Sequence, residues 1–106
     1  CHFLEKTVDT GGIISVKTFP IFNSDRVEDL IKRTYVYLNF LFFEICSELV
    51  NNVSLKKINL EWERTPYKKK DLNELCKLSK KMDIDEIQKR IRATTFPGKP
   101  GPYYID

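Results

Sequence analysis

The 106-residue sequence has one histidine, three cysteines and four glycines, and it contains no long uninterrupted apolar run. One histidine and three scattered cysteines supply neither a zinc-finger ligand set nor a paired disulfide framework. The most apolar segment, residues 35–50, is interrupted by Asn39, Glu44 and Glu48, whereas a membrane span needs about 18 apolar residues in succession. We therefore expect no metal site, no membrane partner, reduced thiols and a cytoplasmic location.

Charge of one sign does not dominate either, because 18 basic and 15 acidic residues leave a net charge of only +3. The distribution is uneven: residues 1–55 hold five basic and seven acidic groups, and residues 56–106 hold thirteen and eight. The basic half has two interpretations. It is a solvated surface in which acids interleave the lysines, or it is a binding module for nucleic acid or another partner.

Local patterns predict an α/β domain, and the length allows only one. Apolar residues at steps of three and four predict a long helix over residues 24–50, capped by Asn23 or Ser24. β-branched residues and carboxylate-capping patterns predict the other elements. These are strands over 13–21, 55–62 and 103–105 and short helices over 71–81 and 84–93.

The first twelve residues hold the most distinctive chemistry, since His2 and Asp9 lie seven residues apart and Asp9 opens an Asp-Thr-Gly-Gly turn. An aspartate beside glycines lies where backbone can approach a ligand closely, and it can orient a histidine or move a proton through water. The spacing alone favours a turn-capping aspartate and a packed histidine over a catalytic pair.

Residues 1–14, Cys-His-Phe-Leu-Glu-Lys-Thr-Val-Asp-Thr-Gly-Gly-Ile-Ile, resemble the signature of the folate-dependent formyltransferases. In that family a histidine on a strand is followed by a six-residue loop, Asp-Thr-Gly or Asp-Gly-Gly, and two aliphatic residues. The segment from Arg92 to Gly101 is similar to the one after the catalytic domain in several members. The resemblance implies the C-terminal portion of an open Rossmann-like sheet with a long helix (residues 1–52). A basic extension with two short helices and a terminal strand follows (residues 53–106).

The resemblance also implies the site residues. Asp9 matches the catalytic aspartate, and His2 matches a secondary histidine with a supporting role, as does Thr10 in the turn. The loop reads the pterin of the formyl donor, 10-formyltetrahydrofolate, and consists of Leu4, Glu5, Lys6, Thr7, Val8 and Asp9. The family's catalytic asparagine and histidine lie upstream, so we expect the missing N-terminal half of the catalytic domain as a partner and no activity from these residues alone.

The implied function is formyl transfer to an amine. The tRNA-modifying members have a barrel of about a hundred residues after the catalytic domain, and only about 55 residues follow the expected long helix, too few for it. They also tend to have proline where this sequence has Gly12. We therefore expect a nucleotide-linked amino sugar or another small amine as acceptor, with initiator tRNA as the alternative. A non-catalytic basic binding module is the competing class. Aromatic residues run around the long helix, which favours a homo-oligomer.

Overall fold

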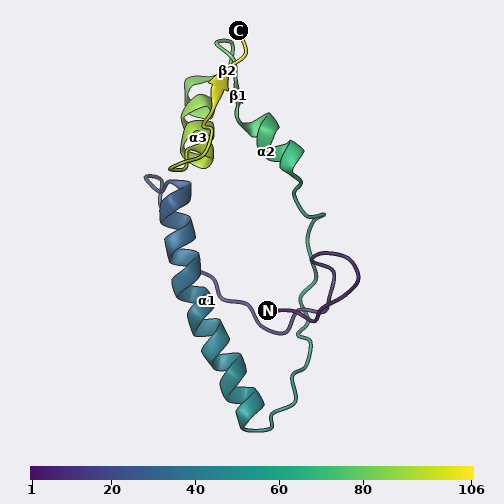
Figure 1. The fold of residues 1–106 in the computed structure, drawn as a ribbon. Coiled ribbons are helices and arrows are strands. Elements are labelled where there is room, and N and C mark those ends of the chain that lie inside the picture. Colours follow the sequence, from purple (N-terminus) through teal and green to yellow (C-terminus); the bar gives the residue numbers. More distant parts are fainter. The chain divides into compact units, whose positions relative to one another are not determined.

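The computed structural model describes residues 1–106 and contains three helices and one two-stranded parallel sheet (Figure 1). The expectation of a mixed helix and strand protein is confirmed at this level. The open Rossmann-like sheet stays a prediction. In chain order the elements are α1 (Val27–Val50), α2 (Lys69–Leu75), β1 (Lys77–Leu78), α3 (Ile84–Thr94) and β2 (Tyr103–Tyr104).

The chain forms two compact units, which are described separately. The first unit comprises Cys1–Pro20 and Arg33–Pro66, and the second comprises Ile21–Lys32 and Tyr67–Asp106. The boundary between them falls within α1. The division at residue 52, expected from the family resemblance, stays a prediction.

The long helix is confirmed, but α1 begins at Val27, so the expected cap at Asn23 or Ser24 was wrong because both residues precede its first turn. The carboxylate of Asp29 accepts the backbone N–H of Arg26 at 2.9 Å, so an aspartate three residues further on satisfies the N-terminal donor. The helix ends before Asn52, which adopts the left-handed conformation with φ 55°.

The strands expected over residues 13–21 and 55–62 do not form, and this part of the prediction was wrong. Ile13 makes an isolated antiparallel bridge with His2, and the N–H of Ile58 donates to the Ile13 carbonyl at 2.8 Å. Both segments have the composition of strands, but a ladder needs a continuous partner. Each segment pairs only a few of its peptide groups within the chain, so neither becomes a strand.

In the second unit the expected helix over residues 71–81 is half wrong. The helix α2 ends at Leu75, because the chain then becomes extended and pairs with β2. In this pairing, the Tyr103 N–H donates to the Cys76 carbonyl and the Ile105 N–H donates to the Leu78 carbonyl, each at 2.9 Å. Leu78 is 2% exposed, so burial of its side chain favours strand over helix at this point. The terminal strand β2 is confirmed.

The helix expected over residues 84–93 is confirmed, with an end at Thr94. Asp83 caps it by accepting the N–H of Asp85 at 2.8 Å. The Arg90 guanidinium joins α3 to α2 and β1 by donating to the Glu74 and Lys77 carbonyls at 3.1 and 3.2 Å.

The buried apolar residues are few and are divided between the units. Ile13, Ile14 and Leu41 are buried in the first unit, and Leu78 and Ile87 in the second. None of the helices combines the length and the apolar character that crossing a lipid bilayer requires.

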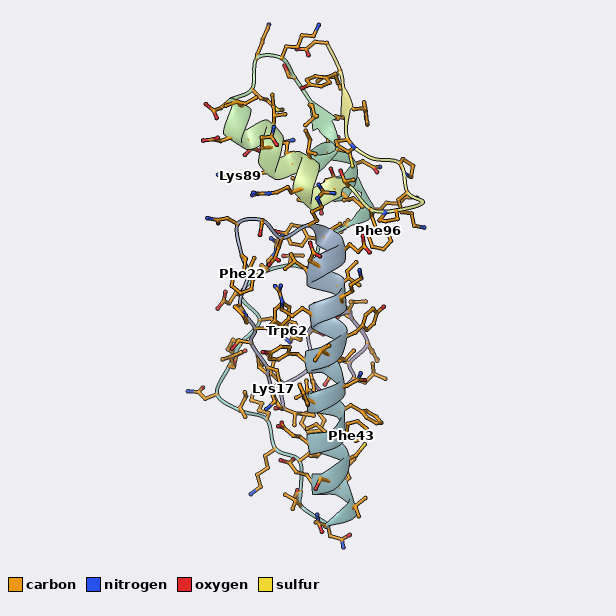
Figure 2. All side chains as sticks on the ribbon, turned by 90° about the vertical axis from the view of Figure 1, so that its left-hand side faces the viewer. Lys17, Phe22, Phe43, Trp62, Lys89 and Phe96 are labelled. Atoms are coloured by element: carbon orange, nitrogen blue, oxygen red, sulfur yellow. The ribbon has the colours of Figure 1, made fainter.

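Self-association is the first testable consequence. Leu41 is the one buried residue of α1, whereas Phe43 is 69% exposed and points away from the helix (Figure 2). Burying such a side chain stabilises by about 1.5–3 kcal/mol, so we expect the 106-residue chain to sediment as an oligomer. Phe43→Asp shifts the distribution toward monomer, while the control Asn39→Asp, which adds the same charge on the same helix, does not. A monodisperse wild-type monomer would contradict the prediction.

Asp106 gives a second prediction, on pH dependence. The carboxylate of Asp106 accepts a hydrogen bond from the Ser79 hydroxyl at 2.5 Å and another from the Lys80 N–H at 2.8 Å. These two bonds lower the pKa of Asp106. Because the pKa of this carboxyl is lower in the folded state than in the unfolded chain, where it is about 4, the ionised carboxylate stabilises the fold at pH values above about 4. This stabilisation is lost as the pH falls through the folded-state pKa. Asp106→Asn therefore lowers the thermal midpoint at pH 7 and not in strong acid. Ser79→Ala reproduces part of this loss, and the two losses combine less than additively. Equal midpoints for Asp106→Asn and wild type at pH 7 would exclude the role.

Candidate functional site

The site is built by backbone pairing between the first three residues and the segment after the glycines. The Phe3 N–H donates to the Gly12 carbonyl at 2.9 Å, and the Ile14 N–H donates to the Cys1 carbonyl at 2.9 Å. Residues 4–11 are thereby closed into a loop, and His2 lies where the loop begins.

Gly11 is the position where the two sides of the loop come closest. A Cβ at Gly11 would lie 1.7 Å from the Phe3 carbonyl oxygen, so no other residue fits there without moving the backbone. The Gly11 carbonyl accepts the indole N–H of Trp62 at 2.8 Å. The Trp62 ring also meets the His2 imidazole edge to face, with centroids 5.1 Å apart and planes at 83°. Figure 2 labels Trp62 among the side chains.

The turn that carries Asp9 is held by two threonines. The Thr10 hydroxyl donates its one hydrogen to the Thr7 carbonyl at 2.9 Å. In the 2.8 Å contact between the two hydroxyls, the Thr7 hydroxyl is therefore the donor and the Thr10 oxygen the acceptor. Asp9 itself adopts the left-handed conformation with φ 53°, which aspartate tolerates better than most residues because its short side chain bonds locally.

The imidazole of His2 lies beside the Asp9 carboxylate, with 3.6 Å between Nε2 and Oδ1. Nδ1 contacts the Phe3 carbonyl at 2.8 Å, and since a carbonyl oxygen only accepts, Nδ1 carries the hydrogen in this bond. Nε2 is thus the nitrogen that faces Asp9. Nε2 donates to this carboxylate only when the imidazole is protonated, since Nδ1 carries the hydrogen of the neutral ring. The two side chains are 30% and 44% exposed, so water reaches both and screens their charges.

Two cavities meet at Asp9. One, of about 280 Å³, is formed by His2 and the loop from Leu4 to Asp9. The other, of about 490 Å³, lies between Asp9 with Thr10 and residues 61–66. Asp9 lines both, so a group bound in either cavity has access to this residue.

The structure brings together His2, Asp9 and the loop residues 4–9 that the family resemblance singles out, and whether they act as expected stays a prediction. The Thr10 hydroxyl is engaged within the turn. Sequence reasoning missed the contribution of residues 61–64, which are Glu-Trp-Glu-Arg and contain the single tryptophan. Nothing in the local sequence of Trp62 pointed to Gly11, 51 residues away.

No three or more histidine, cysteine, aspartate or glutamate side chains gather in a group that could hold a metal ion, and all three cysteines are free thiols. Comparison with protein families, curated proteins and solved structures found no match. Inference about function therefore depends on the motif and on this geometry.

The closeness at Gly11 gives a third prediction. Gly11→Ala should destabilise the first unit by about 1–3 kcal/mol, the usual cost of forcing an extra carbon into a packed position. The matched control is Gly101→Ala, because a Cβ there meets nothing within 4 Å. Amide hydrogen exchange at Phe3 and Ile14 should accelerate in the first variant only. Unchanged exchange in Gly11→Ala would show that the loop relaxes freely.

Proposed function

We propose that the chain supplies the folate-binding loop and one catalytic carboxylate of an enzyme that transfers a formyl group from 10-formyltetrahydrofolate to an amine. One observation carries the proposal: Asp9 lines two adjacent cavities, one formed by the loop and one by an acidic segment. A carboxylate between a donor cavity and an acceptor cavity is in the place that a proton-transferring group needs.

The loop cavity fits the donor. Leu4 and Val8 are 93% and 72% exposed, so two apolar side chains lie open on an otherwise polar loop. A flat heterocycle can cover them while its polar edge bonds to the loop backbone, which is the usual composition of a small-molecule site. The volume of about 280 Å³ suits a ring system, with the rest of the donor outside. When bound, the folate supplies the formyl group.

The acidic cavity fits an amine. Asp9, Glu61 and Glu63 line it against the single cation Arg64. Carboxylates attract an ammonium and disfavour a polyanion. This supports a small amine as acceptor, including the amino group of a nucleotide-linked sugar, ahead of initiator tRNA.

Within this function the Asp9 carboxylate accepts the proton that the attacking amine loses, directly or through one water. His2 supports it in its protonated form, because Nε2 faces Oδ1 and then donates toward the carboxylate. The family's catalytic asparagine and catalytic histidine would stabilise the negative charge that develops on the formyl oxygen. We propose that an N-terminal half supplies both residues, together with the rest of the Rossmann-like sheet. The free thiols suit the cytoplasm that we propose as location.

Binding of the folate tests the donor site directly. Trp62 is the single tryptophan and lies against His2, so its fluorescence reports on the loop. We expect saturable quenching by 5-formyltetrahydrofolate, a stable folate with the same ring system. Absence of saturable quenching, together with binding of nucleic acid whose affinity falls steeply with salt, would favour the basic binding module instead.

The fourth prediction concerns Asp9→Asn, which keeps the shape of the side chain and removes its basicity. The variant should bind 5-formyltetrahydrofolate like the wild type. In enzyme completed with the N-terminal half, it should lower the turnover rate about a hundredfold or more, as loss of a general base does. The control is Glu48→Gln, an exposed carboxylate on α1. A near-normal rate for Asp9→Asn would make Asp9 a turn residue only.

A further inference from the structure

A larger cavity lies in the second unit, between α2 and the segment that leads into β2. Its volume is about 720 Å³, within the range of sites that hold small organic molecules. Lys69 and Leu72 of α2 form one side, and Lys99, Gly101 and Tyr103 form another.

The charge of this cavity is positive. Lys77 pairs with Glu74, with 2.7 Å between Nζ and Oε1, so these two neutralise each other, and the pairing raises the pKa of Lys77. Lys69 and Lys99 form no ion pair and donate no side-chain hydrogen bond in the structure, although both line the cavity. Two cations without a counter-charge at one cavity favour an anionic occupant.

The cavity also offers apolar surface. Tyr103 and Leu72 are each 51% exposed. Lys69 and Lys99 supply the hydrogen-bond donors beside this surface. An aromatic face beside unpaired donors matches a ligand that has a flat ring at one end and a charged group at the other.

We propose that this cavity binds an organic anion with a flat ring, whose phosphate or carboxylate group contacts Lys69 and Lys99 and whose ring packs on Tyr103. The site shares no residue with the loop of the first unit, so the proposal does not depend on formyl transfer.

Titration of the 106-residue chain with phenyl phosphate, followed by NMR shifts of the Lys99–Tyr103 amides, tests the proposal. Inorganic phosphate and phenol each offer half of the chemistry, so each should bind about tenfold or more weakly than phenyl phosphate. Benzoate in place of phenyl phosphate distinguishes a carboxylate from a phosphate ligand. Equal affinity for phenyl phosphate and inorganic phosphate would overturn the role of the ring.

Variants separate the two contributions. Lys69→Gln and Lys99→Gln should each weaken phenyl phosphate binding about five- to tenfold, as loss of a charge-assisted contact does. The matched control is Lys89→Gln on α3 (Figure 2), which lies outside the cavity lining and should change affinity less than about twofold. Tyr103→Leu should weaken phenyl phosphate and leave inorganic phosphate unchanged. Equal weakening by Lys89→Gln would reduce the effect to overall charge and overturn the site.

Cys76 supplies a second readout, because it lines the cavity and is a free thiol. Phenyl phosphate should slow its alkylation by iodoacetamide, measured by peptide mass spectrometry. Cys1, which belongs to the first unit, is the internal control and should react at an unchanged rate. Slowing of both thiols alike, or of neither, would contradict binding at this cavity.

Discussion

The candidate site depends on the backbone pairing of residues 1–3 with residues 12–15. Bonds of 2.9 Å from Phe3 to Gly12 and from Ile14 to Cys1 close the loop, and only glycine at position 11 leaves room for the Phe3 carbonyl. This closure brings the His2 imidazole to the Asp9 carboxylate across seven residues. The two closing bonds join main-chain groups, whereas the Asp9 turn inside the loop also depends on the hydroxyls of Thr7 and Thr10.

The two units differ in the charge of their cavities. In the first unit, carboxylates at positions 9, 61 and 63 outnumber the one cation, and in the second unit unpaired lysines dominate. Net charge, which is only +3, conceals this division. Charged groups near one cavity select a ligand through local attraction, since salt screens exposed charges beyond about 8–10 Å. The linings of the two cavities therefore carry charge of opposite sign, although the overall charge of the chain is small.

Elements with local causes could be predicted from the sequence, and elements with distant causes could not. The Asp83 cap of α3 and the apolar periodicity of α1 act within a few residues, and both helices form nearly as expected. Residues 13–21 have the composition of a strand but lack a continuous partner within the chain. Leu78 lies in a segment with helical pattern, yet it becomes extended because β2 and burial stabilise that conformation.

The same distinction applies to the functional residues. By itself the sequence determined the motif, namely a histidine, a short polar loop and an Asp-Thr-Gly-Gly turn, because the turn is a property of adjacent residues. The tertiary structure decided that Trp62 bonds to Gly11, that residues 61–64 form a second cavity at Asp9, and that Lys69 and Lys99 lie at one cavity. These are contacts between residues far apart in the chain, and no local pattern encodes which distant segments meet.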